Sequence, residues 1–452
     1  MACRSQIAGF GPRWRLSLLV VGLISGEAAA QPVEDAPQVV KPQDQTVMSV
    51  TSLVEELLRQ GKVDEASRVL AAMRKHHPDS MELRFLGGIV AMARSDYRAA
   101  IDLFRAILID HPAAVRVRLE LARAYYLDKD YANADRQFRF ARAGKLPKDV
   151  MANIDGYLFA IRQSKSWSYS LSVSLAPDTN INAGSSAREV TLYGLPFELS
   201  EDARHHSGMG LAVDAGVEWA PRTGPSSRLR VGLNAQRREY SGSQFDDMAL
   251  AAYAGPRFVR RKWDVSVLGT VFQRWYGGDA YARSAGARID ATHYPTPKLA
   301  LFGSLAAQKL DHQRIPEMSG YVYSASAGAY RPLNSISSVT LKGGMNRQDS
   351  RIGAYSSWSG YAAAGYYRDL PAGFSIYLEP SVAFARYDDR LPALDARRSD
   401  KSVSGLVTIL NRHIVLSRFT PRVAYTFTKQ DSNIPLYRFT RHRIEVGLTT
   451  NF

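Results

Sequence analysis

The sequence predicts an all-β transmembrane barrel of 14 antiparallel strands, preceded by a small all-α domain of helix-turn-helix repeats. Three observations lead to this prediction. A period of 34 residues runs through the segment 46–160, and apolar residues alternate with a period of two from Trp167 onward. Beyond residue 30, no apolar run reaches the length of about 18 residues that a membrane helix needs. A chain of this kind can cross a membrane only as a closed barrel.

The segment 1–30 has the three parts of a secretory signal peptide. Basic residues such as Arg13 come first, and the apolar run 16–24 follows. That run has nine residues, which is too short to span a bilayer. Alanines at 28–30 then supply a cleavage site. We therefore exclude the signal from the fold and expect residues 31–45 to be a flexible lead.

Charge and cysteine content restrict the partners that the chain can have. The formal net charge is +15, from 58 Lys and Arg against 43 Asp and Glu. Because the protein is exported, we expect an anionic lipid surface or an acidic cargo as the counterpart, and no nucleic acid. The only cysteine, Cys3, lies inside the signal. The mature chain is therefore expected to have no disulfide and no thiolate metal site.

The segment 46–160 is predicted to contain three units of two helices each. Each second helix opens on a small residue, at a spacing of 34: Ala66, Ala100 and Ala134. An aromatic side chain follows four positions later at Phe104 and Phe138, and Gly88 supplies a small residue in a first helix. This period resembles the tetratricopeptide repeat, in which small residues let the helices cross closely and aromatic rings fill the groove between them.

The concave face of such an array is the predicted cargo-binding site. Arrays of this type present the first helix of each unit on the inside of the curve, where they bind other proteins. The residues predicted there are Phe85, Arg116, Arg123 and Tyr126. The alternative is that the helices only anchor or position another part of the molecule.

The segment 167–452 is predicted to form the barrel, with strands close to the roughly 9–11 residues that a tilted membrane strand needs. Leu229 and Leu233 fall on one face of a strand, whereas Arg228 and Arg230 fall on the other. In a barrel, the apolar face meets lipid and the polar face lines the lumen. The predicted strands are 167–175, 208–219, 227–238, 246–254, 263–274, 281–290, 298–309, 321–330, 337–347, 358–369, 374–386, 401–412, 420–428 and 440–451.

The connections between these strands predict the orientation. The even-numbered ones are short and mostly carry proline, for example Pro256, Pro295 and Pro371, whereas odd-numbered ones such as 183–207 and 388–400 are longer. Short periplasmic turns opposite longer external loops are typical of bacterial barrels. An even strand number places both ends of the barrel on the periplasmic side. We therefore expect a location in the outer membrane, with the helical domain in the periplasm.

The last strand is the strongest local signal for a barrel. Its apolar residues alternate up to the final phenylalanine: Ile444, Val446, Leu448 and Phe452. This pattern resembles the signal that the barrel assembly machinery recognises, so that machinery and outer-membrane lipid are expected partners. A soluble edge strand with the same pattern would expose an apolar edge prone to aggregation.

The sequence predicts neither an enzyme nor a cofactor. It contains no nucleophile elbow, zinc-protease motif, phosphate-binding loop or dinucleotide fingerprint. His205 and His206 are adjacent, so on a strand they would face opposite sides and could not form a metal pair. We therefore predict no catalytic residue and no metal ligand.

A signal peptide, a short tetratricopeptide domain and a 14-stranded barrel together resemble the surface lipoprotein assembly modulator family, the translocators of type eleven secretion. At the start of the barrel, the stretch Pro-Asp-Thr-Asn-Ile-Asn looks like a motif of that family, with Pro177, Asp178, Asn180 and Asn182 at the matching positions. The closing stretch from Glu445 to the C-terminus is also typical of the family.

This resemblance implies an outer-membrane translocator. Its cargo would be specific lipoproteins, or soluble haem- or iron-binding proteins, moved from the periplasm to the cell surface or the medium. The compact N-terminal domain departs from the family and leaves the class of cargo open. Two other functions remain open. An exopolysaccharide export porin also pairs tetratricopeptide repeats with a barrel, whereas a general diffusion porin needs no repeat domain.

Overall fold

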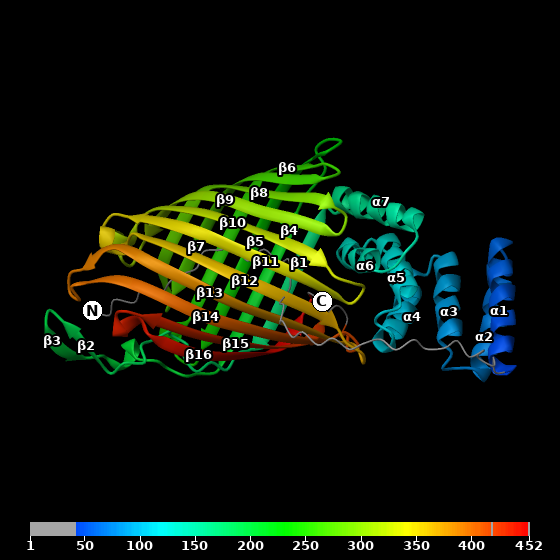
Figure 1. The fold of residues 1–452 in the computed structure, drawn as a ribbon, viewed down its shortest axis with the longest axis horizontal. Coiled ribbons are helices and arrows are strands. Elements are labelled where there is room, and N and C mark those ends of the chain that lie inside the picture. The colour runs from blue at the N-terminus through cyan, green and yellow to red at the C-terminus, as the bar shows by residue number, and fades with distance from the viewer. Residues whose placement is uncertain (1–41, 417–418, 451–452) are drawn as a thin grey trace, which may run out of the picture.

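The computed structural model describes residues 42–416 and 419–450, and it has two parts (Figure 1). A closed barrel of 14 antiparallel strands follows a helical region of seven helices within these residues, which confirms the predicted fold class. The helices lie at one end of the barrel, called here the helix end, and the opposite end is called the loop end. The predicted signal peptide, most of the predicted lead and Phe452 lie outside the described residues.

The helices form three hairpins and one further helix that leads into the barrel. Ser80, Asp96 and Asp130 cap the N-termini of three helices, because each side chain accepts a hydrogen bond from a backbone N–H of the first turn. None of the helices in the described residues is long and apolar enough to cross a membrane. The helices are α1 (Pro42–Arg59), α2 (Val63–His76), α3 (Met81–Ala93), α4 (Tyr97–Asp110), α5 (Val115–Leu127), α6 (Tyr131–Ala143) and α7 (Lys148–Ser164).

The residues of the 34-residue period form the core of the helical region. Phe104 and Phe138 are completely buried, as are the three alanines of the period. At Gly88 of α3, a Cβ atom would collide with the Phe104 ring of α4. The absence of a side chain at this position therefore allows α3 and α4 to pack closely, as the sequence predicts.

The barrel closes between its first and last strands. The order around the barrel is β1-β16-β15 and so on down to β4, with every pair antiparallel. The barrel strands are β1 (Trp167–Leu175), β4 (Gly210–Trp219), β5 (Ser227–Tyr240), β6 (Asp247–Val259), β7 (Trp263–Tyr276), β8 (Asp279–Thr296), β9 (Leu299–His312), β10 (Gly320–Pro332), β11 (Ser337–Ser350), β12 (Ser357–Asp369), β13 (Phe374–Leu391), β14 (Ala396–Asn411), β15 (Thr420–Ser432) and β16 (Phe439–Thr449).

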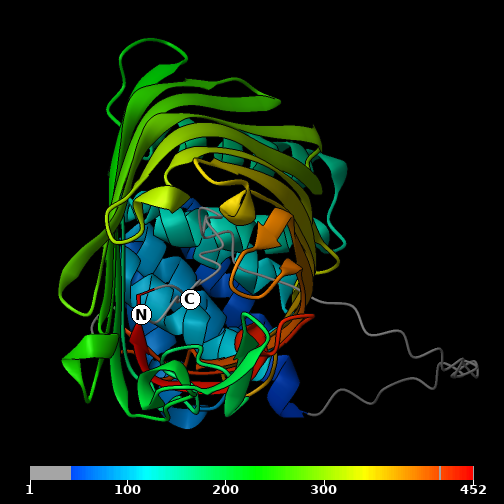
Figure 2. The same cartoon turned by 90° about the vertical axis from the view of Figure 1, so that its left-hand side faces the viewer.

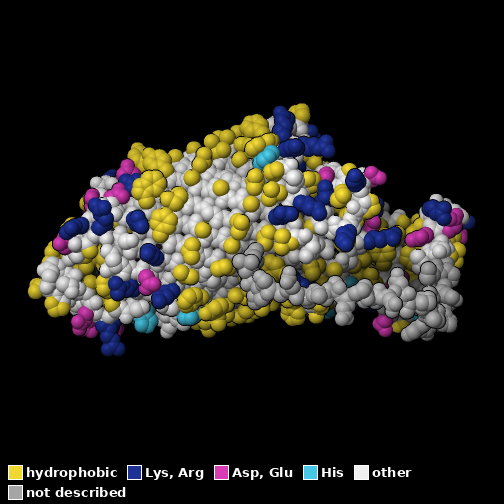
Figure 3. Space-filling model, viewed as in Figure 1, with side chains coloured by type: hydrophobic (Ala, Val, Ile, Leu, Met, Phe, Trp, Pro, Cys, Tyr) yellow, Lys and Arg dark blue, Asp and Glu magenta, His cyan; other side chains and the backbone are white. Residues whose placement is uncertain are grey.

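The outer wall of the barrel is apolar, as the alternation predicts. Leu229 and Leu233 of β5 are exposed on the outside, whereas Arg228 and Arg230 are buried on the inner side. In Figure 3, hydrophobic side chains and uncharged surface cover the middle of the wall, and Lys and Arg gather toward its two ends. An apolar band between charged rims is the surface that a bilayer requires.

The connections differ from the sequence prediction in three respects. The first connection contains a small hairpin, β2 (Glu189–Leu192) with β3 (Leu195–Glu198), which the sequence did not predict. The predicted loop 388–400 is mostly strand, because β13 and β14 extend beyond the predicted bounds and leave a turn of 392–395. Several prolines predicted in turns lie inside strands.

Two prolines, Pro256 and Pro295, lie inside barrel strands at places where the strand pairing is interrupted. Pro256 lies within β6, and the pairing of β6 with β7 is interrupted there. Pro295 lies within β8, whose register with β9 shifts at the same place. Because proline has no N–H to donate, each one interrupts the ladder on one side without ending the strand.

Candidate functional site

A buried carboxylate fastens the helical region to the barrel. Asp369 is the last residue of β12, and 1% of its side chain is exposed. Arg118 of α5 lies 3.0 Å from this carboxylate, Arg412 of the β14–β15 turn lies 3.4 Å from it, and Arg136 of α6 lies 3.9 Å from it. Three guanidinium groups from both parts of the molecule therefore share one negative charge.

Arg118 is the deepest of these cations, with its side chain completely buried. It donates to Oε1 of Gln137 over 2.6 Å and to the carbonyl of Pro112 over 2.7 Å, besides Asp369. Burial lowers the pKa of Arg118, and the charge of Asp369 raises it only in part. A guanidinium still stays charged at any physiological pH, so its partners are required to offset the cost of burial.

Aromatic rings extend this contact along the rim of the barrel. The Phe140 ring of α6 lies 5.6 Å from the Tyr367 ring of β12, and Arg136 lies over Tyr367. Arg139 of α6 and Arg162 of α7 both lie over the ring of Tyr294 in β8. Figure 2, viewed from the loop end, shows the helices lying across the far end of the barrel. The helical region is therefore held at several points around the rim.

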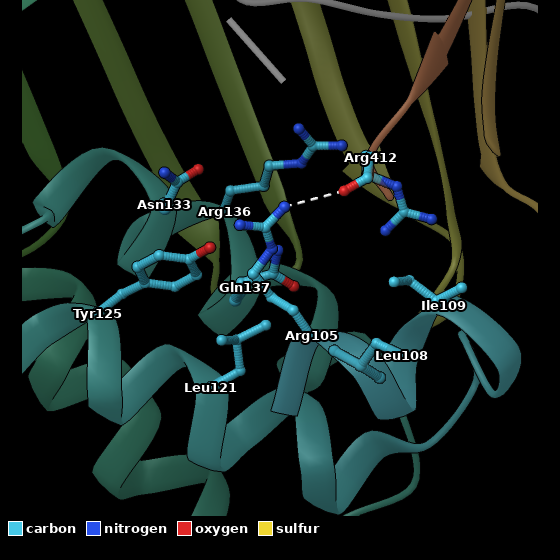
Figure 4. Close-up of a pocket in the computed structure, with 9 residues that line it drawn as sticks. All are labelled: Arg105, Leu108, Ile109, Leu121, Tyr125, Asn133, Arg136, Gln137 and Arg412. Atoms are coloured by element: carbon cyan, nitrogen blue, oxygen red, sulfur yellow. Dashed lines mark hydrogen bonds between the residues drawn. The ribbon is translucent and has the colours of Figure 1, made fainter. Parts of the chain in front are cut away.

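A cleft opens beside this junction (Figure 4). The space beside the lining residues amounts to about 450 Å³, open solvent included. Its lining includes three arginines and no carboxylate, and Arg105 of α4 donates to the carbonyl of Arg412 over 2.8 Å. The lining residues are Arg105, Leu108, Ile109, Leu121, Tyr125, Asn133, Arg136, Gln137 and Arg412.

The predicted cargo-binding residues are distributed over three places. Phe85 and Arg116 lie in contact, because the guanidinium is 5.3 Å from the centre of the ring. Arg123 pairs with Glu120 over 2.8 Å and is partly exposed. Tyr126 packs edge-on against Tyr157 of α7, with 5.0 Å between ring centres. Of the four residues, only Phe85 and Arg116 are thus shown in contact with each other. Tyr126 is partly covered by α7.

The motif at the start of the barrel joins the first strand to the last one. The Asp178 carboxylate is completely buried and accepts from Arg441 of β16, with the shortest contact at 2.6 Å. Backbone hydrogen bonds continue the contact, from the N–H of Ile444 to the carbonyl of Pro177 and from the N–H of Thr179 to the carbonyl of His442, each 3.0 Å. These contacts cross the line where the barrel closes.

The two asparagines of the motif hold the first loop in place. Asn180 donates to the carbonyl of Gly184 over 3.0 Å and accepts from its N–H over 2.8 Å. Asn182 accepts from the N–H of His206 and donates to the carbonyl of Arg204. The motif residues thus connect β1, the first loop and β16. We call the segment 177–182 with Arg441 the seam clasp.

The clasp lies where strand pairing is short. Four residue pairs join β1 to β16, between 172–175 and 446–449, whereas nine pairs join β1 to β4. At the other end of this short ladder, the N–H of Thr450 donates to the carbonyl of Leu171 over 2.9 Å. The clasp therefore reinforces the weakest pairing around the barrel wall.

The last strand has the predicted alternation over its described residues. Ile444 and Val446 are exposed on the outer wall, and Glu445 between them is buried and pairs with Arg422 over 3.0 Å. Leu448 pairs with Val173 in the register of β1. Recognition of this strand by the barrel assembly machinery stays a prediction.

Charges on the inner wall are largely paired with one another. Arg230 lies 2.9 Å from Glu218 and 3.3 Å from Asp290, and Arg274 lies 2.6 Å from Asp247. Within the described part of the chain, no group of three or more His, Cys, Asp or Glu side chains could hold a metal ion. The inner wall thus carries both positive and negative side chains.

Sequence reasoning missed the junction around Asp369. The partners lie 251 residues apart, so no local pattern joins them. One signal was available at Arg118, which lies three and four positions before the buried Leu121 and Ala122 and therefore on the buried side of α5. A cation on a buried stripe indicates a partner outside the helix.

A closed barrel with an apolar outer wall, a polar inner wall and a helical region fixed across one end belongs to the class of outer-membrane β-barrel proteins. Within that class, the chain belongs to the surface lipoprotein assembly modifier family. The family model with that description matches residues 167–452, and the model for the N-terminal tetratricopeptide repeats of the family matches residues 43–138.

Several relatives are similar to this chain over most of their length. The chain is 23% identical to a surface lipoprotein assembly modifier of Pasteurella multocida, over 85% of this chain and 79% of the relative. Identity is 22% to surface lipoprotein assembly modifier 1 of Neisseria meningitidis serogroup B, over 98% and 91%. It is also 22% to the hemophilin secretion modulator of Acinetobacter baumannii, over 81% and 78%.

Similarity to solved structures is low. An anion-selective porin from Comamonas acidovorans aligns with a TM-score of 0.35 and 11% identity, over 63% of this chain and 98% of the porin. A likeness of this size does not indicate a function.

Proposed function

We propose that this protein is an outer-membrane translocator that moves specific lipoproteins, or soluble haem- or iron-binding proteins, from the periplasm to the cell surface or the medium. Membership of the surface lipoprotein assembly modifier family supports a role in surface lipoprotein assembly. The relative named as a hemophilin secretion modulator supports a haem-binding protein as one kind of cargo.

The proposed orientation places the helix end of the barrel in the periplasm. The even number of strands brings both ends of the barrel to the same side, and α7 leads into β1 with only residues 165–166 between them. The even-numbered turns, including those that carry Ser335 and Arg412, contact the helices. Compact turns on the periplasmic side agree with the usual arrangement in bacterial barrels.

The observation that carries the proposal is the docking of the helices around Asp369. A freely tethered repeat domain could only concentrate cargo near the membrane, whereas a docked one can present cargo at a fixed position beside the barrel. We propose that Phe85 and Arg116 contribute to the surface that receives cargo, together with the exposed Arg123. The paired charges of the inner wall would then offer a passing polypeptide no large excess of one sign.

The test is surface display of a cargo protein in a host that lacks this chain. The host expresses a lipoprotein cargo together with either the unaltered chain or its Asp369→Asn variant. Removal of the shared carboxylate leaves buried guanidinium groups without their counter-charge, a change that typically costs about 3–5 kcal/mol. We expect the variant barrel to reach the membrane and cargo on intact cells, measured by antibody binding, to fall about tenfold or more.

The matched control is Asp395→Asn in the β13–β14 turn. Asp395 is exposed and pairs with Arg390 over 3.0 Å at the other end of the barrel, so its loss should leave display unchanged. Display that is normal in the Asp369→Asn variant, with the helices shown by protease digestion to be undocked, would contradict a role for docking. Absence of display with the unaltered chain and every cargo tried would overturn the proposed function.

A further inference from the structure

Positive charge accumulates at the cleft between the helical region and the barrel. Arg118, Arg136 and Arg412 share the single carboxylate of Asp369, and Arg105 lies on the same cleft with a carbonyl as its partner. Three guanidinium groups therefore share one negative charge, and a fourth, that of Arg105, lies on the same cleft. Repulsion among cations that are partly removed from water costs energy unless a further anion is bound.

The cleft is lined largely by hydrogen-bond donors. Besides its arginines, the lining contains the hydroxyl of Tyr125 and the amide of Asn133, whose Nδ2 already donates to Asp130 over 2.9 Å. Burial raises the pKa of Tyr125 to about 12, so its hydroxyl stays protonated and can donate. The Nε of Arg412 has no hydrogen-bond partner within the described residues. In Figure 4, side chains from α4, α5 and α6 face the turn that carries Arg412 across this space.

We propose that this cleft binds a carboxylate side chain of an acidic peptide segment. Guanidinium groups bind carboxylates through paired, charge-assisted hydrogen bonds, which supply the affinity. Leu108 and Leu121 are buried beneath the arginines, so the guanidinium groups are the part of the cleft that recognises a carboxylate. This inference rests on the proposed function for the source of the peptide, which would be a cargo segment passing from the helices to the barrel.

The position of the cleft agrees with this role. Its walls come from the second and third helical hairpins and from a barrel turn, so a segment bound there touches both parts of the molecule at once. The contact of Phe85 with Arg116 lies on α3 and α5 of the same two hairpins. A cargo held at that contact could therefore extend an acidic segment toward the cleft.

The experiment measures peptide binding to the purified full-length protein in detergent. The probe is a fluorescein-labelled peptide of sequence Leu-Glu-Leu-Asp-Leu-Glu, and its twin has every acid replaced by the corresponding amide. Fluorescence anisotropy should show that the acidic peptide binds about tenfold or more tightly than the amide twin, because a hydrogen bond to a charged group contributes about 1.5–3 kcal/mol. Added salt should weaken binding of the acidic peptide and leave binding of the amide twin unchanged.

The test variant is Arg105→Gln, and the matched control is Arg98→Gln on the same helix. Arg105 lines the cleft, whereas Arg98 is exposed and lies 4.0 Å from Asp128 on the outside of α4. We expect Arg105→Gln to weaken binding of the acidic peptide about tenfold. Arg98→Gln should leave the affinity within about twofold of the unaltered protein. Neither variant removes a contact to Asp369, but Arg105→Gln also removes the bond to the Arg412 carbonyl, so protease digestion must show that the helices stay docked in both variants.

Equal binding of the acidic peptide and its amide twin would overturn the inference, as would unchanged binding to Arg105→Gln. Vesicles with anionic lipid head groups that displace the peptide, and whose own binding is lost in Arg105→Gln, would assign the cleft to lipid instead. If the acidic peptide does not bind, only the inference about the cleft is overturned. Cargo display then remains the evidence for translocation. Tight binding of the peptide without any cargo display would instead overturn the proposed function and retain the site.

Discussion

Single residues decide how closely the elements of this protein pack, and Gly88 is the clearest case. Its position leaves no room for a Cβ atom against the Phe104 ring, although its backbone is ordinary helix. Glycine is therefore required here for steric reasons, because the neighbouring helix α4 leaves no room for a side chain. The 34-residue period predicts this small residue from the sequence alone, because each repeat uses the same helix crossing.

Gly88→Ala is expected to destabilise the helical region by about 1–3 kcal/mol through overpacking against Phe104. The measurement is hydrogen exchange of the α3 and α4 amides, which should become faster. The control is Gly156→Ala in α7, where a Cβ atom would meet nothing within 4 Å. That change should be neutral or stabilising, since alanine is the better helix former. Equal exchange in both variants would contradict the packing argument.

Asp178→Asn is expected to weaken the seam clasp. The buried guanidinium contacts of Arg441 would lose their counter-charge, and the short ladder between β1 and β16 would lose its reinforcement. The folded barrel should then unfold at a lower temperature in detergent, seen as a change of migration in gels. Asp431→Asn, at an exposed residue 4.0 Å from Lys429, should leave that temperature unchanged. A clasp variant as heat-resistant as the control would remove the structural role of this motif.

Among the elements, the pairing of β1 with β16 differs most from its neighbours. Four residue pairs close the barrel there, against 13 between β10 and β11. Ser172 and Thr449 are opposite each other in this ladder, and both are buried on the inner side of the wall. Opposed residues of an antiparallel pair lie about 4.5–5.5 Å apart between Cα atoms, which suits a disulfide bond.

A double variant, Ser172→Cys with Thr449→Cys, is therefore expected to form a disulfide without added catalyst and to raise the unfolding temperature of the barrel. The background is clean, because the only native cysteine is Cys3 in the predicted signal peptide. Mass spectrometry of the oxidised protein gives the yield, and the two single-cysteine variants are the controls. A reduced pair in most molecules would mean that the seam does not close as described.

Sequence patterns predicted these elements unevenly. Alternation identified every barrel strand, because each one has lipid on one side and polar groups on the other. The extension of β13 to Leu391 was missed because Asp388 and Asp389 look like loop residues, although Asp388 pairs with Arg347 of β11, two strands away. Such cross-strand pairs depend on register, which the sequence of one strand does not reveal.

For the molecule as a whole, the docking of the helices was the least predictable feature. The repeat period and the barrel were each evident, but the contact between Arg118 and Asp369 joins two residues that no pattern relates. The same holds for the cleft, whose arginines come from three separate segments of the chain. Features within one element could thus be predicted, whereas features formed between the two parts required the structure.

The central claim is that the whole molecule translocates protein, and deletion of the chain in its own host tests this most directly. The measurement is quantitative mass spectrometry of surface-exposed and secreted proteins, with and without the chain. We expect one or a few lipoproteins or haem-binding proteins to disappear from the surface or the medium and to accumulate in the periplasm, with surface polysaccharide unchanged. An unaltered set of surface and secreted proteins would contradict the account, and loss of polysaccharide alone would indicate an exopolysaccharide exporter instead.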